Sequence, residues 1–252
     1  MLPKLSIIIP TYNEFDQLAK KVESLSHLKK AFKNSIEIII LDSNSTDDSI
    51  KWLKQLQEAR VAAYYLLSLK PGQIQSIGVA LNQACNLASA DSVLILPVDI
   101  EISTQQVEKV LHWAGTEAQW GCFFKRYDSL SFVMRFYCFL QNQILTKCLQ
   151  QGVWTNVFFL KKNLSHLFPE IGFLEDVVFS DRLKSHSKGV IITDPVRVSV
   201  RKYNFDGLFR RIFYNGVIIF LYRCGYRNYT ALKDLYVGRI GLRHLLLKKL
   251  GS

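Results

Sequence analysis

The first hundred residues alternate between short apolar runs and segments whose apolar residues recur every three or four positions. The runs are rich in branched side chains, as buried strands are, and they lie at residues 5–9, 36–41, 62–67 and 93–96. Helical spacing is clearest from Leu18 to Leu25 and from Ile50 to Leu56. This order predicts an α/β fold: a Rossmann-like, mostly parallel sheet covered by helices on both faces.

The pattern is less regular after residue 96. Residues 120–124 predict a further strand, residues 132–149 an aromatic-rich helix, and residues 174–184 a helix that opens with two acidic residues. Amphipathic basic helices are predicted at residues 205–226 and 229–250. With no repeat or obvious linker, we expect one domain over residues 1–204, followed by a basic helical extension over residues 205–252.

The positive charge of the chain is concentrated at its C-terminal end. The net charge is +11, but residues 1–181 hold 17 basic and 18 acidic side chains, whereas residues 182–252 hold 15 basic and three acidic ones. Such asymmetry predicts an anionic partner for the C-terminal segment. No helix-turn-helix, zinc-finger or RNP-like pattern is present, so we predict that nucleic acid is not the partner.

Apolar residues are interleaved with the C-terminal charge, as in Phe-Arg-Arg-Ile-Phe-Tyr at residues 209–214. This pattern fits a helix lying on an anionic membrane surface, and it fits equally a helix that packs its apolar side on the protein's own core. The apolar run at residues 216–222 is far shorter than the roughly 20 residues of a spanning helix.

The five cysteines are scattered, with no Cys-x-x-Cys pair, which argues against a disulfide framework and a zinc ribbon. The histidines show no metal-ligand spacing. The first apolar run is too short for a secretory signal. We therefore predict a cytoplasmic protein, with peripheral attachment to the inner face of the membrane as an extension of that hypothesis.

Polar and acidic residues follow several predicted strands, at residues 10–14, 42–48, 97–101 and 173–176. Each segment alone is typical of a strand-to-helix turn. Ligands of open parallel sheets bind beyond the carboxyl ends of the strands, so the turns together indicate a binding site.

These segments resemble the family 2 glycosyltransferases, which have the GT-A fold. Residues 5–14, Leu-Ser-Ile-Ile-Ile-Pro-Thr-Tyr-Asn-Glu, nearly repeat the family's first strand and turn, and residues 42–49 resemble its D-D/G-G-S-T-D-x-S turn. Gln-Ser-Ile-Gly at residues 75–78 stands where the family often has R-N-x-G. Residues 120–121 and 172–177 resemble a bacterial branch with W-G-x-F and M-E-D-V motifs. The resemblance spans about residues 5 to 203.

The resemblance implies an inverting transferase that moves a sugar from a nucleotide-sugar donor to an acceptor hydroxyl, on a lipid-linked or surface glycan. It assigns Asp42 as acceptor of a hydrogen bond from the nucleotide base, whose N–H would be costly to bury unpaired. Pro10, Thr11, Asn13 and Glu14 would shape the same pocket. Glu14 serves either the ribose hydroxyls or the N-terminus of the following helix.

The acidic pair Glu175 and Asp176 resembles the family's catalytic motif. By position Asp176 would be the base that takes the proton of the acceptor hydroxyl, and Glu175 would orient or bind the acceptor. Both acids equally suit the N-terminus of a helix. Adjacent helical residues point in different directions, so we expect at most one base.

A hard cation, Mg²⁺ or Mn²⁺, would neutralise the departing diphosphate. Asp99 falls where the family places the last acid of its D-x-D, and Glu101 is a weaker helper. Pro97 stands in place of the first acid, which leaves the site poorer in carboxylates. A helix-capping role before Ser103 and Thr104 is the other interpretation of Asp99.

Arg182, Arg201 and Lys202 are candidates for binding the diphosphate, since a guanidinium can pair two phosphate oxygens. A solvated basic face is the competing interpretation. The changes at Pro97, Gln75 and Ser76 also favour a second hypothesis for the whole protein. It would be a catalytically degenerate relative that binds a nucleotide, a glycan or a partner.

Overall fold

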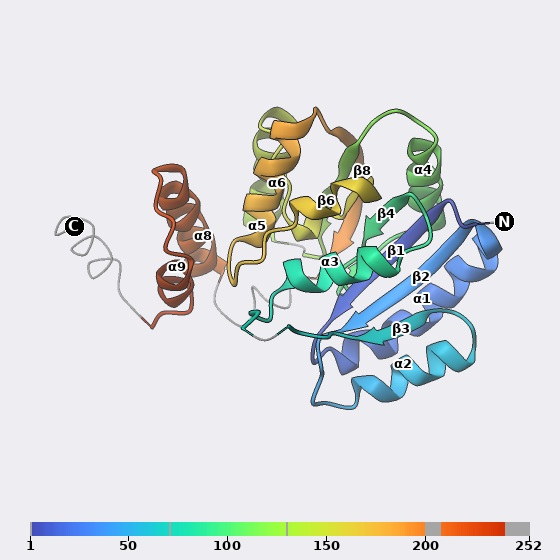
Figure 1. Cartoon of the computed structure of the whole chain (residues 1–252). Helices are drawn as coiled ribbons and strands as arrows, with labels where there is room; N and C mark the ends of the chain where they lie inside the picture. Colours follow the sequence, from blue (N-terminus) through green and yellow to red (C-terminus); the bar gives the residue numbers. More distant parts are fainter. Residues whose placement is uncertain (1, 71, 130, 200–207, 240–252) are drawn as a thin grey trace. The chain divides into compact units, whose positions relative to one another are not determined.

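A computed structural model describes residues 2–70, 72–129, 131–199 and 208–239 (Figure 1). The chain divides into two compact units. The first comprises Met1–Glu170 and Glu175–Ser199, and the second comprises Ile171–Leu174 with the chain from Val200 onward. The predicted domain boundary at residues 204 and 205 lies outside the described residues and stays a prediction.

The first unit is built on one eight-stranded sheet with the order β3-β2-β1-β4-β7-β6-β8-β5. Four neighbouring strands are parallel: β1 (Leu5–Thr11), β2 (Ile36–Asp42), β3 (Ala63–Leu66) and β4 (Ser92–Ile95). They match the four predicted apolar runs. Because their carboxyl ends share one edge of the sheet, the turns that follow β1, β2 and β3 meet there.

The other half of the sheet is mixed. It contains β5 (Ile100–Glu101), β6 (Trp120–Tyr127), β7 (Phe158–Lys161) and β8 (Val190–Val198). Strand β7 is antiparallel to both β4 and β6, β8 is parallel to β6, and β5 is antiparallel to β8. The predicted mostly parallel sheet is confirmed, with this mixed half as a refinement.

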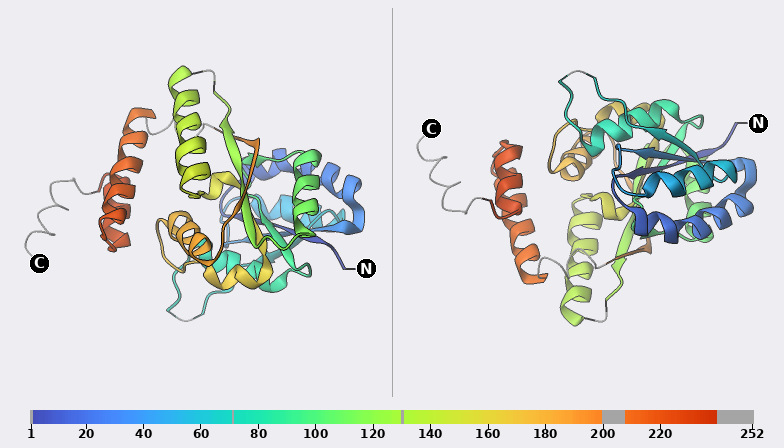
Figure 2. Two further views of the ribbon diagram at one scale, coloured as in Figure 1. Left: turned by 90° about the horizontal axis from the view of Figure 1, so that it is seen from above. Right: turned by 90° about the horizontal axis from the view of Figure 1, so that it is seen from below.

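Helices cover both faces of the sheet, as Figures 1 and 2 show. Helices α1 (Phe15–Phe32) and α2 (Ser49–Glu58) lie on one face, and α3 (Ile77–Leu87) and α6 (Glu175–His186) lie on the other. The reversal follows from the strand order, because right-handed connections to β2 and β3 and then to β4 run in opposite directions along the sheet. Helix α4 (Thr104–Ala114) places Trp113 against Phe159 of β7, with ring centroids 4.7 Å apart.

The central strands explain the Trp-Gly pair at residues 120–121. Trp120 is fully buried, and its indole N–H donates to the Ser187 carbonyl at 2.9 Å. A Cβ on Gly121 would lie 2.3 Å from the Phe159 ring and 2.4 Å from the Val190 carbonyl oxygen. Glycine is required there because both neighbours of β6 approach its backbone closely.

Helix α5 (Phe132–Leu140) continues into η2 (Gln141–Cys148), whose turns are wider than those of an α-helix. Together they form the predicted helix over residues 132–149. The shorter turns η1 (Lys33–Ser35), η3 (Trp154–Asn156) and η4 (Lys162–Leu167) complete the first unit. The pairing of β6 with β8 shifts register between Phe123 and Lys125.

The second unit contains α8 (Leu208–Arg223) and α9 (Tyr229–Tyr236). Ile218 and Leu221 of α8 form a small apolar core with Leu232 and Leu235 of α9, so the two helices bury part of their apolar faces against each other. The predicted helices are confirmed over these spans, but they end earlier than predicted, since residues 224–226 and 237–239 form turns and irregular structure. The other predicted helical residues, 205–207 and 240–250, lie outside the described part of the chain. Among the described helices, none is both long and apolar enough to cross a bilayer.

Candidate functional site

The turns after β1 and β2 are joined at the edge of the sheet. Thr11 and Asp42, the last residues of the two strands, pair directly in the parallel register. The backbone N–H of Ser43 then donates to the Thr11 carbonyl at 2.9 Å. Two candidate donor-binding residues, Thr11 and Asp42, are therefore neighbours, as the sequence predicted.

A buried serine connects these turns. Asp42 is fully buried, and its carboxylate accepts hydrogen bonds from the Ser45 backbone N–H at 2.7 Å and from the Ser45 hydroxyl at 2.5 Å. The Ser45 hydroxyl oxygen accepts the backbone N–H of Asn13 at 2.8 Å. Asn13 has a φ of 51°, a left-handed conformation that asparagine tolerates well. The Asp42 carboxylate thus holds the turn of β2 against the turn of β1.

Further side chains extend this network to the turn after β3. The Asn13 side-chain oxygen accepts the Thr46 N–H at 2.8 Å, and the Asp47 carboxylate accepts the Phe15 N–H at 3.1 Å. The Gln75 amide donates to the Ser43 carbonyl at 2.7 Å. Gln75, at the position where the resemblance places an arginine, therefore supports the turn of β2.

The Thr11 hydroxyl lies within this network but has no hydrogen-bond partner among the described residues. Thr11 is only 4% exposed, so the unpaired hydroxyl carries a desolvation cost. An unpaired buried polar atom at the carboxyl edge of parallel strands fits a site that a ligand completes. Pro10 immediately precedes it and is half-buried.

Glu14 occupies the N-cap position of α1. Its carbonyl accepts the backbone N–H groups of Gln17 at 3.0 Å and Leu18 at 2.9 Å, and its side chain makes no capping hydrogen bond. The position agrees with the helix-terminal interpretation of its charge. A contact between Glu14 and ribose stays a prediction.

The candidate metal carboxylates lie beside a buried lysine that the sequence analysis did not identify. Lys21 of α1 is 4% exposed, and its ammonium group donates to the Ile100 carbonyl. Burial lowers the pKa of Lys21 to about 8, while the negative charges of Asp99 and Glu101 act to raise it. The ammonium group of Lys21 therefore interacts electrostatically with both carboxylates.

Asp99 is half-buried and Glu101 is exposed. Within the described ranges, no three His, Cys, Asp or Glu side chains are grouped closely enough to hold a metal by themselves. Binding of Mg²⁺ or Mn²⁺ by these two acids stays a prediction, and such an ion would take its other ligands from phosphate oxygens and water, as Mg²⁺ commonly does.

The second acidic motif lies at the start of α6, where Glu175 and Asp176 are the first two residues. The carboxylate of Asp176 accepts its neighbour Val177's backbone N–H at 2.8 Å and also interacts with the N–H of Trp154 in η3. Desolvation raises the pKa of Asp176, against the lowering effect of these N–H groups and of Lys125. A carboxylate in this setting holds a proton more readily than an exposed one, as a general base requires.

Lys125 of β6 is the buried cation near Asp176, and it too was missed from the sequence. Its residue is 3% exposed, and its Nζ donates to the Thr155 hydroxyl at 3.2 Å. Burial lowers the pKa of Lys125 to about 8, against the opposing effects of Asp176 and of Cys138 and Cys122 in their ionised forms. The available sequence signal was a lysine followed by Arg126 at the end of a mostly apolar strand, which is also typical of an exposed strand end.

The predicted diphosphate-binding residues are only partly described. Arg182 of α6 donates to the Leu167 carbonyl at 3.0 Å, which connects α6 to η4. Arg201 and Lys202 lie outside the described residues. The assignment of all three to diphosphate stays a prediction.

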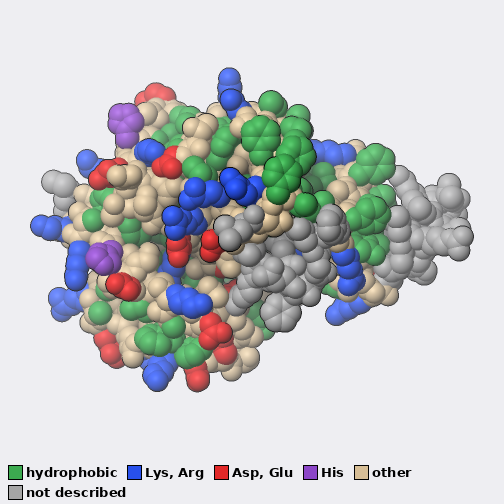
Figure 3. All heavy atoms as spheres, turned by 180° about the vertical axis from the view of Figure 1, so that it is seen from behind, with side chains coloured by type: hydrophobic (Ala, Val, Ile, Leu, Met, Phe, Trp, Pro, Cys, Tyr) green, Lys and Arg blue, Asp and Glu red, His purple; other side chains and the backbone are tan. Residues whose placement is uncertain are grey.

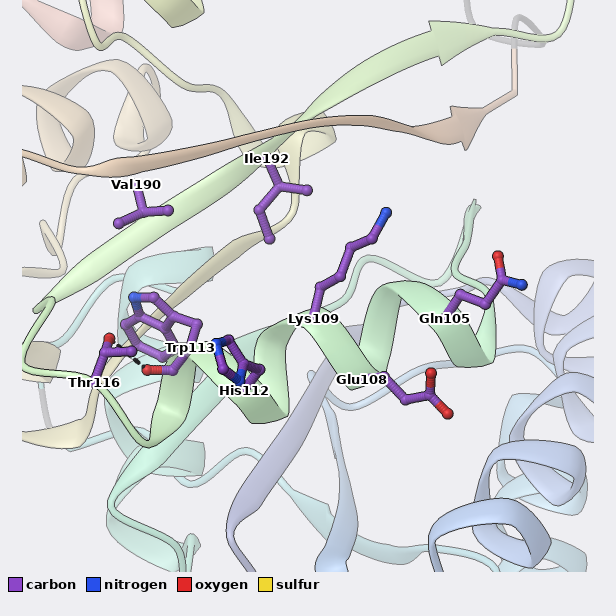
Figure 4. Close-up of a pocket in the computed structure, with 8 residues that line it drawn as sticks. All are labelled: Gln105, Glu108, Lys109, His112, Trp113, Thr116, Val190 and Ile192. Carbon is purple, nitrogen blue, oxygen red and sulfur yellow. Dashed lines mark hydrogen bonds between the residues drawn. The ribbon is translucent and has the colours of Figure 1, made fainter.

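A separate hollow of about 640 Å³ lies between α4 and β8 (Figure 4). It is lined mostly by apolar atoms, from Gln105, Glu108, Lys109, His112, Trp113, Thr116, Val190 and Ile192. None of the predicted site residues lines it. Its size alone does not make it the functional site, because the strand-end turns and the acidic motif lie elsewhere.

Comparison with known proteins identifies the fold. Mannosyltransferase PcManGT from Pyrobaculum calidifontis, solved with GDP-Man and Mn²⁺, matches with a TM-score of 0.64 and 17% identity over 94% of this chain and 69% of that chain. S. aureus TarS 1-349, solved with UDP-GlcNAc, matches with a TM-score of 0.62 and 17% identity over 79% of this chain and 59% of that chain. These likenesses confirm the predicted GT-A fold.

Curated bacterial proteins are similar over part of the chain. An undecaprenyl-phosphate 4-deoxy-4-formamido-L-arabinose transferase from Proteus mirabilis is 28% identical over 43% of this chain and 32% of that protein. The Escherichia coli UDP-Glc:alpha-D-GlcNAc-diphosphoundecaprenol beta-1,3-glucosyltransferase WfaP is 29% identical over 52% of this chain and 49% of that protein. The chain therefore spans half or less of the length of these relatives.

The sequence profile of one family covers most of the first unit. Residues 6–173 match Glycosyl transferase family 2, which is well over half of the chain and includes the three joined turns. From this match and the confirmed fold, we conclude that the chain belongs to glycosyl transferase family 2.

Proposed function

We propose that the protein transfers a sugar from a nucleotide-sugar donor to an acceptor hydroxyl, with inversion at the anomeric carbon. The observation that carries this proposal is the pairing of two features within one folded unit. The strand-end turns surround a buried Thr11 hydroxyl beside Asp42 that has no hydrogen-bond partner among the described residues, and Asp176 is a desolvated carboxylate at a helix start. The strand-end turns suit the binding of a nucleotide, and Asp176 suits the role of general base.

The donor's nucleotide would bind over the turns of β1 and β2. Asp42 accepts the base N–H, and the Thr11 hydroxyl gains the partner that it lacks among the described residues. Pro10, Asn13 and Glu14 shape the pocket around the base and ribose. The rigid network through Ser45 supports this role, because a preorganised site does not have to be ordered when the donor binds.

In the transfer step, the acceptor oxygen attacks the anomeric carbon as its proton passes to the Asp176 carboxylate. The bond from the anomeric carbon to the diphosphate oxygen breaks, and the nucleoside diphosphate leaves with the electron pair. A single displacement of this kind inverts the anomeric centre. Glu175 orients the acceptor.

The leaving diphosphate would be neutralised by several groups. Asp99 and Glu101 would hold Mg²⁺ or Mn²⁺, which when bound supplies positive charge to the departing phosphate oxygens. Arg182, Arg201 and Lys202 would add further positive charge. Solved structures of the same fold contain Mn²⁺ or Mg²⁺ with nucleotides, which supports the metal assignment in general.

The acceptor would be a lipid-linked glycan intermediate at the inner, cytoplasmic face of a membrane. The named activities of the bacterial relatives involve undecaprenyl-linked substrates. The outer face of α5 supports membrane contact, since it exposes four apolar side chains: Phe132, Val133, Phe136 and Phe139. Figure 3 shows a face of the molecule on which basic side chains gather beside hydrophobic ones, as binding to an anionic membrane would require.

Incubation with a panel of UDP- and GDP-sugars, with and without Mn²⁺, tests the proposal. We expect release of the nucleoside diphosphate from at least one donor, and loss of that turnover in Asp176→Asn with donor binding retained. Binding without turnover for every donor would favour the degenerate binding protein. No binding and no turnover would contradict both.

A further inference from the structure

Two ionisable side chains of opposite charge lie in the first unit beside η3, a buried lysine and a half-buried aspartate. Lys125 lies on β6 and Asp176 begins α6, and neither is used by the strand-end turns that would bind a donor. A buried ammonium group is costly unless hydrogen bonds and an opposite charge compensate it. The buried Lys125 therefore needs hydrogen-bond partners and an opposite charge nearby.

The short turn η3 contacts both charges. The backbone N–H of Trp154 interacts with the Asp176 carboxylate, and the hydroxyl of the next residue, Thr155, accepts a hydrogen bond from Lys125 Nζ at 3.2 Å. Consecutive residues of one turn thus fix an anion and a cation. This arrangement limits the movement of both side chains relative to each other.

The backbone of Lys125 is also held by side chains. The Asn142 side chain of η2 accepts the Lys125 N–H at 3.1 Å and donates to the Lys125 carbonyl at 2.8 Å. The Cys138 thiol donates to the same carbonyl at 3.0 Å. The register shift of β6 lies here, and such irregularities redirect side chains at functional sites. Wide helical turns such as η2 are also frequent at functional sites.

We propose that Lys125 is a positioning residue for the proposed transfer reaction: its buried ammonium group, fixed by Thr155, holds the carboxylate of Asp176 as an anion ready to accept the acceptor's proton. This inference rests on the proposed role of Asp176 as the base. Lys125 acts through Asp176 and through η3, without contact to the reacting atoms.

The electrostatic effect of Lys125 on the pKa of Asp176 has the direction that this role requires. Desolvation raises the pKa of Asp176 and Lys125 opposes that rise, so loss of the lysine charge shifts the pKa of Asp176 further upward. Cys122 and Cys138 are the other titratable groups that act on Lys125. Burial raises the pKa of both thiols, that of Cys122 to about 12, so both are neutral near pH 7 and do not replace Asp176 as the counter-charge.

The test compares Lys125→Met, which removes the charge, with Lys125→Arg, which keeps it. Carbon-13 NMR of labelled aspartate, with Asp176→Asn for assignment, follows the titration of Asp176 directly. We expect its midpoint to move up by about one pH unit or more in Lys125→Met, as for loss of a nearby opposite charge, and to stay at the wild-type value in Lys125→Arg. The acid limb of donor turnover should move with it.

Lys161→Met is the matched control. Lys161 lies on the neighbouring strand β7, with its ammonium 5.2 Å from the Trp113 ring centroid, much as that of Lys125 lies 5.6 Å from the ring of Tyr127. We expect its removal to leave the Asp176 midpoint unchanged. If Lys125→Met does not fold, Thr155→Val removes the hydroxyl partner alone and should give a smaller upward shift.

An unchanged Asp176 midpoint in every folded Lys125 and Thr155 variant would overturn the inference. Unchanged pH dependence of turnover in Lys125→Met would do the same. The NMR result does not depend on catalysis. An upward shift in a protein that turns over no donor would therefore refute the proposed function while confirming the electrostatic link between the two residues.

Discussion

The two halves of the candidate site are constructed in opposite ways. On the β1–β2 side, short polar side chains connect three turns, with Ser45 bonded to both Asp42 and Asn13. On the β6–α6 side, the buried Lys125 and the half-buried Asp176 are ionisable groups linked through one turn, η3. The first half is a rigid scaffold of hydrogen bonds, whereas the second places charges in a poorly solvated setting.

This difference predicts different responses to mutation and pH. Loss of one neutral hydrogen bond costs about 1 kcal/mol, so the donor side should tolerate single changes. Loss of either charge on the base side should have a larger effect, because a buried charge left without a counter-charge is costly. The pH dependence of turnover should arise on the base side, because the pKa of Asp176 is the one raised there.

The largest expected effect is on the base side. Asp176→Asn removes the proton acceptor and should lower turnover by about 10²–10⁴-fold, the usual contribution of a general base. Donor affinity should change little, since Asp176 lies outside the turns that bind the nucleotide. Initial rates and calorimetric donor binding measure the two effects, and turnover near the wild-type value would remove Asp176 from the mechanism.

Next in size is Asp42→Ala on the donor side. Loss of a charged acceptor for the base N–H should weaken donor binding by about 10–100-fold, corresponding to roughly 1.5–3 kcal/mol. Ser45→Ala is the control, because it also damages the turn but leaves the carboxylate in place. Equal losses of affinity in the two variants would mean that Asp42 acts only through the turn.

A change on α5 tests which region faces the lipid. Phe136→Ser combined with Phe139→Ser should weaken co-sedimentation with anionic vesicles by about tenfold or more, given the area these exposed rings can bury. Donor hydrolysis should be unaffected. Phe213→Ser on α8 replaces a comparably exposed ring, and a larger loss there would assign membrane contact to the C-terminal helices.

The smallest expected effect separates ligand binding from folding. Thr11→Val removes a buried hydroxyl that has no partner among the described residues, so the free energy of unfolding should stay the same or rise slightly. Donor affinity should fall by about fivefold to tenfold, because one neutral hydrogen bond is lost. Thermal unfolding and donor titration measure both, and loss of stability without loss of affinity would contradict the site.

The donor side could be predicted from the sequence because its elements are local. Residues 5–9 and 36–41 are continuous apolar runs, and each is followed at once by the polar residues that form the turn. The mixed half was harder to predict. Strand β7 has only four residues, and β8 contains Asp194 and Pro195 and lacks a continuous apolar run, so neither was recognised.

The base side was predicted only in part, because its charges come together through long-range packing. Asp176 was identified by its motif, but its link to Lys125 depends on η3, which lies some 20 to 30 residues from either residue in the sequence. Lys21 likewise faces Asp99 and Glu101 only after α1 packs on the sheet. No local pattern marks a lysine as buried.

A crystal structure of Asp176→Asn with an intact nucleotide-sugar donor tests the central claim most directly. The account predicts that the nucleotide base lies over the turns of β1 and β2 and donates its N–H to Asp42, and that the donor supplies a partner for the Thr11 hydroxyl. It also predicts that the diphosphate lies beside Asp99 and that the anomeric carbon faces residue 176. A donor bound elsewhere, for example in the hollow between α4 and β8, or a nucleotide without contact to Asp42 and Thr11, would contradict it.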